Sequence, residues 1–153
     1  MVGHDKLTSE GKKFFKEIEE LAKLELRVGF QRGEKDDNGA DIADVAMWNE
    51  LGTVNMPPRP FLRQSVDTNE TTIKTMCQSQ LKAIASGKRT AQEALQIIGD
   101  LQKSLIQNTI LNGEFESNAD ATVKKKKSDR PLIDTGRMRQ SVNFVIQAKG
   151  GSS

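Results

Sequence analysis

The residues that most strongly suggest chemistry lie at positions 132–136, Leu-Ile-Asp-Thr-Gly. Two apolar residues followed by Asp-Thr-Gly are typical of aspartic proteases, in which two such aspartates share one proton. The surroundings of Asp134 argue against this chemistry, because Arg137 and Arg139 follow where a protease needs an apolar strand. A short motif without its context is weak evidence. We therefore interpret Asp134 as a helix N-cap, with Thr135 and Gly136 in the same structural turn, and keep the protease as the enzymatic alternative.

A second candidate site is a run of four lysines, Lys124 to Lys127, followed by Arg130. These cations can neutralise phosphates of duplex DNA without reading its sequence. The competing interpretation is a solvated loop, because most charge runs face water.

The sequence does not indicate other catalytic or metal sites. His4 is the only histidine and Cys77 the only cysteine, a set that favours neither a zinc site nor a Ser-His-Asp or Cys-His catalytic set. We expect no catalytic residues, no metal and no cofactor. The single cysteine also excludes an internal disulfide and fits a reducing compartment.

Composition predicts one domain over residues 1–153 with a thin, aliphatic core. The chain has 23 basic and 21 acidic residues, a net charge of +2, with 35% hydrophobic and only 5% aromatic residues. A balanced charge does not indicate a dedicated nucleic-acid binder. No apolar run reaches the ~20 residues of a membrane helix, and no secretory signal is expected.

The pattern of apolar residues predicts an α+β fold, in which a small antiparallel sheet packs against a long helical hairpin. A capping box formed by Thr90 and Glu93 should begin the second hairpin helix. Asp41 should cap an earlier short helix that Gly52 ends. We expect mobile loops at 31–40 and 113–130 and a flexible tail from Gly150 to Ser153. The expected helices span 9–24, 41–51, 61–85 and 90–111, with one further helical turn over 135–140. The expected strands span 24–30 and 141–147.

The segment from Trp48 to Leu62 is the most informative part of the chain. Proline holds φ near one value, so three prolines in four residues favour an extended, pre-ordered segment suited to contact rather than catalysis. Trp48 and Phe61 are either anchors of an interface or members of the core, and the sequence leaves both open. The candidate interface residues are Trp48, Pro57, Pro58, Arg59, Pro60, Phe61 and Arg63, the two arginines being able to pair with acidic residues of a neighbour.

Two separate motifs carry a resemblance to a known family. The stretch from Asn49 to Leu62, with Asn-Glu-Leu-Gly-Thr and Met-Pro-Pro-Arg-Pro-Phe-Leu, resembles a signature of small morphogenesis proteins of tailed bacteriophages. The sequence Pro-Leu-Ile-Asp-Thr-Gly-Arg-Met-Arg-Gln-Ser at 131–141 resembles a second motif of the same proteins, in the same order. Leu51 departs from the pattern, where phenylalanine is commoner, and residues 64–111 match only in periodicity.

The resemblance implies a non-enzymatic virion protein that joins the phage head to the tail or completes the head-proximal end of the tail. Such proteins act as ring subunits, commonly hexameric, between head-connector and tail proteins of the neck. The implied location is the virion, and the host cytoplasm during assembly, with non-specific contact to genomic DNA. Alternatives are a tail terminator, a minor capsid protein, a nucleic-acid-binding module or the protease at Asp134.

Overall fold

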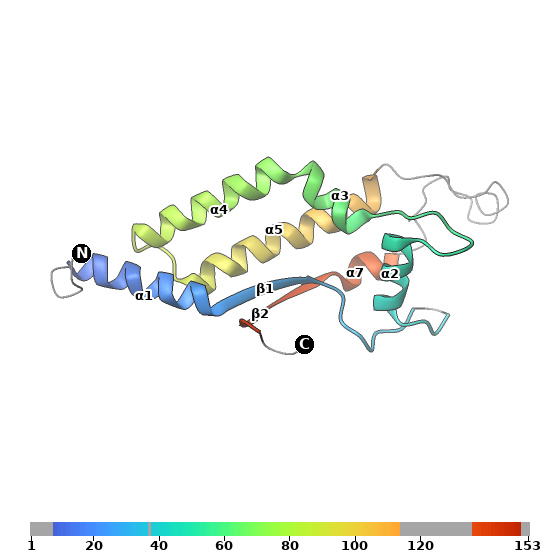
Figure 1. Ribbon diagram of the computed structural model, residues 1–153, viewed down its shortest axis with the longest axis horizontal. Helices are drawn as coiled ribbons and strands as arrows, with labels where there is room; N and C mark the ends of the chain where they lie inside the picture. The colour runs from blue at the N-terminus through green and yellow to red at the C-terminus, as the bar shows by residue number, and fades with distance from the viewer. Residues whose placement is uncertain (1–7, 37, 114–135, 151–153) are drawn as a thin grey trace. The chain divides into compact units, whose positions relative to one another are not determined.

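The computed structural model describes residues 8–36, 38–113 and 136–150 and confirms the predicted α+β class, a small antiparallel sheet packed against helices (Figure 1). In chain order the elements are α1 (Ser9–Lys23), β1 (Leu24–Gly29), α2 (Ile42–Leu51), α3 (Phe61–Thr68), α4 (Glu70–Ala85), α5 (Ala91–Asn112), α7 (Gly136–Ser141) and β2 (Asn143–Ala148). The two strands form one two-stranded sheet.

These elements form two compact units that are interleaved along the chain. Unit 1 comprises residues 1–27, 71–101 and 144–153, and unit 2 comprises residues 28–70 and 102–143, each within the described residues. The strands and α5 run through both units. The prediction of a single domain over the whole chain stays a prediction, and each unit is described by itself below.

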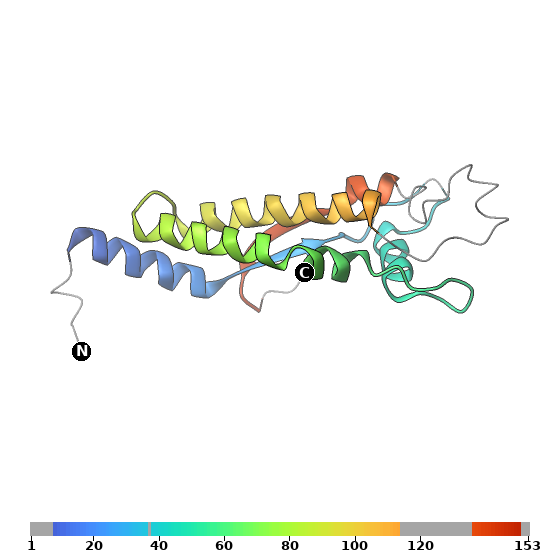
Figure 2. The same ribbon diagram turned by 90° about the horizontal axis from the view of Figure 1, so that it is seen from above.

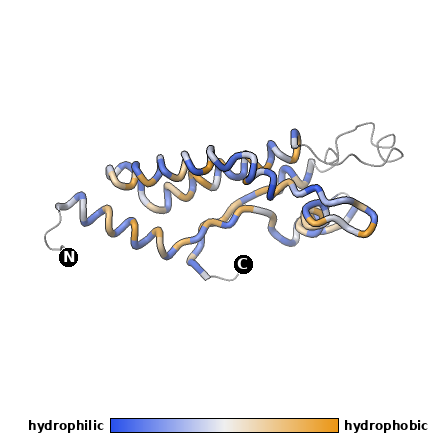
Figure 3. The backbone as a smooth tube through the Cα atoms, turned by 45° about the horizontal axis from the view of Figure 1, so that its top comes forward, coloured by the Kyte–Doolittle hydropathy of each residue, from blue (hydrophilic) through white to orange (hydrophobic). Residues whose placement is uncertain are grey.

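Unit 1 begins with α1, which is amphipathic and leads directly into the sheet. The hydroxyl oxygen of Thr8 accepts from the backbone N–H of Gly11 and caps the helix. Apolar and charged residues alternate along α1 with helical spacing (Figure 3). At Leu24 the backbone becomes extended, and the strand starts without a connecting loop.

The register of the sheet is set by pairs at its end in unit 1. The backbone N–H of Lys149 donates to the carbonyl of Lys23 at 2.8 Å, and the amide of Gln147 donates to the carboxylate of Glu25 at 3.1 Å. The hydrogen bond from Gln147 lowers the pKa of Glu25 below its ordinary value. This register fits the predicted pairing of the first and last strands.

The sheet packs closely on α5 at a glycine. A Cβ placed on Gly99 would lie 2.5 Å from the ring of Phe144 in β2, well inside van der Waals contact. Glycine at this position therefore lets the helix backbone approach the aromatic ring. The small buried residues Ala91 and Ala94 on the same helix allow close packing in unit 1 as well.

The turn between α4 and α5 is built from local signals that the sequence predicted. The N–H of Gly87 bonds to the carbonyl of Ile84, and the N–H of Lys88 to that of Ala83, the paired bonds of a Schellman motif. Gly87 has a φ of +76°, which suits glycine. Within unit 1 the two helices run in opposite directions in both views (Figures 1 and 2).

The predicted capping box at the start of α5 is confirmed. The hydroxyl of Thr90 accepts from the N–H of Glu93 at 3.2 Å, and the carboxylate of Glu93 accepts from the N–H of Thr90 at 2.9 Å. These hydrogen bonds, the one from the Thr90 backbone first, lower the pKa of Glu93.

The helix predicted over 61–85 is interrupted at Asn69, which separates α3 from α4. Two polar side chains of α3 and that of Asn69, which follows it, donate to carbonyls of the helix, and such bonds compete with its continuation. Ser65 donates to Leu62, Thr68 to Gln64 and Asn69 to Ser65, all between 2.7 and 2.8 Å. Periodicity alone did not reveal this break, because the apolar spacing continues across it.

The core of unit 2 gathers apolar residues from four helices. The rings of Phe30 and Phe61 meet edge to face with centroids 5.9 Å apart, and Val28, Val45 and Leu62 pack around the buried cluster. The buried members are Ile42, Ala46, Phe61, Ile106, Ile110, Met138 and Val142. Most members of this cluster are aliphatic, and Phe61 is its largest fully buried side chain.

The described part of the 31–40 loop is held by hydrogen bonds. The carboxylate of Asp36 accepts from the N–H groups of Asn38 and Ala40, and the guanidinium of Arg137 donates to the carbonyl of Lys35 at 2.6 Å. The hydrogen bond from Arg137 ties this segment to α7, and its predicted mobility stays a prediction. Residues 114–130 of the second predicted mobile loop lie outside the described residues.

Candidate interaction surface

The Trp48–Leu62 segment starts in α2, whose two ends match the sequence prediction. The carboxylate of Asp41 caps the helix by accepting from the N–H of Ala43 at 2.9 Å, and also accepts from the N–H of Gly33 at 3.0 Å. Hydrogen bonds from Gly33 and then Ala43 lower the pKa of Asp41. Gly52 ends the helix with a φ of +79°.

After Gly52 the chain folds back on itself in a short hairpin. Thr53 and Met56 form an antiparallel bridge, and the N–H of Arg59 donates to the carbonyl of Asn49 at 2.6 Å. A Cβ on Gly52 would lie 2.8 Å from the backbone nitrogen of Pro58. The proline segment is thus pre-ordered by backbone contacts and glycine as well as by proline itself.

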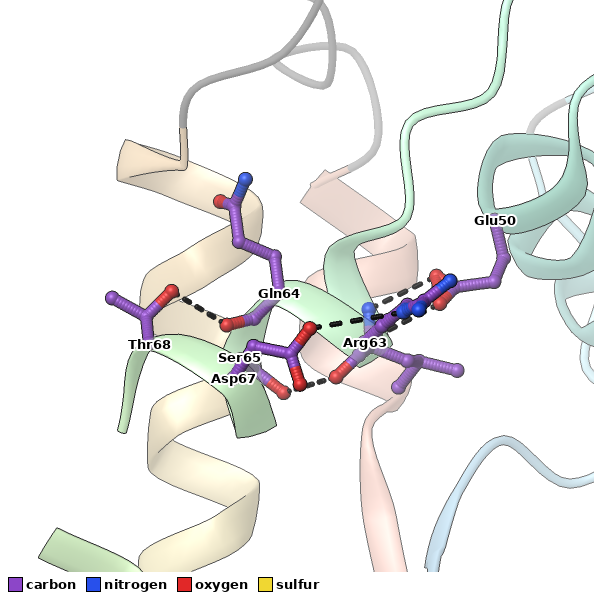
Figure 4. A network of polar contacts seen from close by, with 7 residues as sticks. Glu50, Arg63, Gln64, Ser65, Asp67 and Thr68 are labelled. Atoms are coloured by element: carbon purple, nitrogen blue, oxygen red, sulfur yellow. Dashed lines mark hydrogen bonds and ion pairs between the residues drawn. The ribbon is translucent and has the colours of Figure 1, made fainter. Parts of the chain in front are cut away.

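Glu50 fastens the far end of this segment to α2 (Figure 4). Its two carboxylate oxygens accept from the backbone N–H groups of Leu62 and Arg63, each at 3.0 Å. Pro60, at the N-cap position of α3, supplies no side-chain hydrogen bond. A carboxylate near the N-terminus of a helix is also favoured by the helix dipole. Glu50 therefore caps α3 from another helix.

The constrained segment carries four exposed large apolar side chains, which together we call the apolar face. Its members are Met47, Trp48 and Leu51 on α2 and Val54 at the hairpin, with exposed fractions of 47, 44, 70 and 103%. Four large apolar residues exposed within eight positions are unusual for an isolated soluble chain, and such patches mark interaction sites.

The structure places the predicted interface residues in different environments. Trp48 is exposed, whereas Phe61 is fully buried in the core of unit 2 and Arg59 is only 4% exposed. Phe61 therefore packs in the core, one of the two roles that the sequence left open. Arg63 is exposed and lies 3.7 Å from Asp67 in an ion pair across one helical turn.

The three prolines support the surface rather than form its centre. Pro57 and Pro60 are half-buried, and Pro58 is exposed beside Gly52. The side chain of Arg59 is buried within the chain, and its predicted pairing with an acidic residue of a neighbour stays a prediction. Trp48, Pro58 and Arg63 are the predicted interface residues that are exposed.

Several predicted residues lie outside the described part of the chain. They include Lys124, Lys125, Lys126, Lys127, Arg130, Asp134 and Thr135, as well as His4. Gly136 begins α7, which agrees with the expected short helix after the Asp-Thr-Gly motif. The predicted N-cap of that helix and the DNA contact therefore stay predictions.

Within residues 8–36, 38–113 and 136–150, no group of three or more His, Cys, Asp or Glu side chains could hold a metal ion. Cys77 is half-buried on α4. No described helix is both long enough and apolar enough to cross a membrane.

Unit 2 also contains an open groove of about 510 Å³ between α3 and the end of α5. Its lining is uncharged and largely carboxamide and hydroxyl, with Gln64, Thr68, Asn69, Leu105, Asn108, Thr109, Asn112 and Gly113. The hydroxyls of Thr68 and Thr109 already donate to carbonyls of their own helices. This lining lacks the charged or nucleophilic groups that a catalytic site requires.

Sequence reasoning missed Glu50 and most of the apolar face. Trp48 was a predicted anchor, whereas Met47 and Val54 carried no signal of their own and Leu51 stood out only as a departure from the family motif. A hint was present in the composition, since α2 has apolar residues on more faces than one partner element can cover. Nothing local indicates that Glu50 reaches a helix that begins eleven residues later.

Comparison of the chain with protein-family models, with curated proteins and with solved structures gave no match.

Proposed function

We propose that this chain is a non-enzymatic structural protein of a tailed-phage virion. In this role it joins the head to the tail, or completes the head-proximal end of the tail, as the subunit of a ring. The observation that carries the proposal is the apolar face of Met47, Trp48, Leu51 and Val54, held on a segment that is ordered before any partner binds. The resemblance of residues 49–62 and 131–141 to phage morphogenesis proteins supports the same role.

Pre-ordering favours binding because little conformational entropy is lost when the partner docks. The bridge between Thr53 and Met56, the bond from Arg59 to Asn49 and the Glu50 cap each remove freedom from the segment beforehand. Rigid presentation of an anchor lowers the free-energy cost of association. Trp48 is the strongest candidate anchor, because tryptophan is enriched among residues that dominate binding energy.

The size of the apolar face fits a subunit that associates weakly alone and stably in a ring. The four side chains expose on the order of a few hundred Å², whereas a stable interface buries about 800 Å² on each partner. A single contact of this size is therefore weak. Closure of a ring gives every subunit two contacts, so stability grows with completion and premature association is avoided.

Electron microscopy of lysates tests the assembly role. In cells infected with the parent phage while this gene is silenced, filled heads beside finished, unattached tails are expected. Normal infectious particles would overturn the proposal, and overlong tails would favour the tail-terminator alternative. Release of a peptide by the purified chain, inhibited by pepstatin, would instead support the enzymatic alternative at Asp134.

Complementation of the silenced gene tests the apolar face itself. The double variant Trp48→Glu, Leu51→Glu should fail to restore joined particles, since each lost anchor costs about 2 kcal/mol, or about thirtyfold in Kd. The matched control is Val66→Glu, Leu81→Glu, which places two carboxylates on exposed apolar residues of α3 and α4. Full rescue by the double variant would mean that another surface carries the function.

A further inference from the structure

The sheet leaves one edge of β1 without a neighbouring strand. Within residues 8–36, 38–113 and 136–150, β1 and β2 are the strands of this sheet, and they lie side by side (Figures 1 and 2). A two-stranded sheet is marginally stable by itself, and an open strand edge is a template for pairing with another strand. The free edge of β1 is therefore a candidate interaction surface.

The register of the sheet shows which backbone groups point out of this edge. The N–H of Lys149 bonds to the carbonyl of Lys23 at 2.8 Å, which places these two residues opposite each other. In an antiparallel pair, residues that bond to the neighbouring strand alternate with residues that point away from it. Glu25 and Arg27 therefore direct their backbone groups toward β2, whereas Leu26 directs its N–H and C=O outward. No described residue outside the sheet hydrogen-bonds to the backbone of Leu26.

The two sides of β1 differ in chemistry. In this register the even-numbered residues of both strands share one side of the sheet, on which the ring of Phe144 packs against α5. Leu24 and Leu26 lie on this inner side and are half-buried. Glu25 and Arg27 lie on the outer side, where the carboxylate and the guanidinium form an ion pair at 3.3 Å. A strand that pairs with β1 must therefore be apolar on one side and suited to charges on the other.

A second copy of β1 meets both requirements in one antiparallel register. When Leu26 lies opposite the partner's Leu26, the outward N–H and C=O groups of the two residues face each other, and Glu25 lies opposite the partner's Arg27. Two-fold symmetry repeats this contact between Arg27 and the partner's Glu25. The next charge along the strand, Lys23, lies opposite the partner's Gly29, which carries none.

Charge selects this register over its neighbours. Opposite charges directly across two antiparallel strands are stabilising, and like charges are destabilising. A shift by one residue in either direction places Arg27 opposite the partner's Arg27, or Glu25 opposite the partner's Glu25. The alternation of Glu25 and Arg27 therefore disfavours both neighbouring registers.

We infer that the free chain pairs with a second copy of itself along β1 and forms a four-stranded sheet in the order β2-β1-β1-β2. The two-fold axis passes between the two Leu26 residues, perpendicular to the sheet, so α5 of both copies lies on the same side. The inner apolar side becomes continuous, and the outer side carries alternating charges. This pairing goes beyond the proposed assembly role and is centred in unit 1, whereas the apolar face belongs to unit 2.

The pairing protects the strand edge but remains easily reversible. An unpaired edge promotes aggregation, and self-pairing satisfies its outward N–H and C=O groups. A contact of about five residues from each strand buries less than the about 800 Å² on each partner that is typical of a stable interface. The dimer should therefore dissociate with a Kd on the order of 1–100 µM.

Sedimentation equilibrium of the full chain between about 5 and 500 µM measures this Kd. Glu25→Arg and Arg27→Glu each place like charges opposite one another in both halves of the contact, so each should raise the Kd about tenfold or more. The double variant Glu25→Arg, Arg27→Glu restores opposite charges in the same register and should recover most of the affinity. An equimolar mixture of the two single variants should also dimerise, because every arginine of one copy then faces a glutamate of the other.

The matched controls are Glu19→Arg and Lys74→Glu, which reverse exposed charges of α1 and α4 in unit 1. They should leave the Kd within about threefold of the natural value, and circular dichroism checks that all variants keep their helices. Amide hydrogen exchange followed by NMR gives a second readout. The N–H of Leu26 should exchange more slowly as the protein concentration rises, whereas the N–H of Arg27, which faces β2, should not change.

A natural chain that stays monomeric over the whole concentration range would overturn the inference. So would equal losses in the single variants and the controls, or no dimer in the mixture of the two single variants. Loss of the dimer in the Trp48→Glu, Leu51→Glu variant would instead assign the contact to the apolar face and overturn the pairing along β1. The proposed function is tested by particle morphology, so the two proposals can fail separately.

Discussion

Replacing Glu50 by alanine should destabilise unit 2 without touching its apolar core. The substitution removes both acceptors at 3.0 Å from the N–H groups of Leu62 and Arg63, and Pro60 offers no side-chain cap in their place. Loss of an N-cap costs about 1–2 kcal/mol. The helix that loses its cap has only eight residues and begins with the buried Phe61, so fraying at this end exposes core surface.

Urea unfolding, followed by the fluorescence of Trp48, measures this loss locally because Trp48 is the only tryptophan and lies in α2. The midpoint should fall, and the thermal midpoint should drop by about 2–4 °C for each kcal/mol. Glu50→Gln keeps one acceptor oxygen and should lose less. Glu19→Ala removes an exposed carboxylate of α1 and should stay within about 0.5 kcal/mol of the natural chain.

A local cap should restore what the remote cap supplied. Adding Pro60→Asp to Glu50→Ala places an acceptor at the N-cap position, where the φ of −77° is open to other residues. Recovery of about half the lost stability or more is expected. Equal midpoints for Glu50→Ala and Glu19→Ala would refute the capping role of Glu50.

Three further predictions concern other positions. Gly99→Ala should destabilise by about 1–3 kcal/mol in urea unfolding despite alanine's higher helix propensity, because its Cβ would overlap the ring of Phe144, and Phe144→Leu should relieve much of the loss. Gln80→Met should raise stability by about 1 kcal/mol, since Gln80 is 7% exposed and no described residue hydrogen-bonds to its Oε1. The backbone hydrogen bonds that lower the pKa of Asp41 stabilise the fold above its ordinary pKa and are lost as pH falls below about 4. Asp41→Asn should therefore flatten the acid limb of the stability curve, and an unchanged limb would contradict this origin.

Local signals predicted most of the secondary structure because each acts within a few residues. Asp41 and Thr90 cap the helices that follow them, and Gly52 and Gly87 adopt positive φ at the helix ends. Such interactions depend on side-chain chemistry and backbone conformation that the sequence specifies directly. The break at Asn69 was not predicted, because the apolar periodicity of the sequence continues through it.

Burial within the Trp48–Leu62 segment was not predictable in the same way. The sequence allowed both Trp48 and Phe61 to be either an interface anchor or a core residue. In the structure Phe61 is fully buried and Trp48 is 44% exposed. The difference arises because Phe61 packs against Phe30 and the buried cluster of unit 2. Trp48 does not belong to this cluster, to which α2 contributes Ile42 and Ala46. Which face of a short helix is covered depends on partners that are distant in the chain.

The sequence by itself determined the α+β class, the helix ends and a stiff proline-rich segment, since these follow from periodicity, capping and restricted dihedral angles. Only the tertiary structure decided that Glu50 caps α3, which side of α2 is exposed, and that Lys13 lies beside the turn that carries Lys88. Each of these is a contact or an exposure created by chain segments that meet only after folding. Their energies depend on distance in space, which local sequence patterns do not encode.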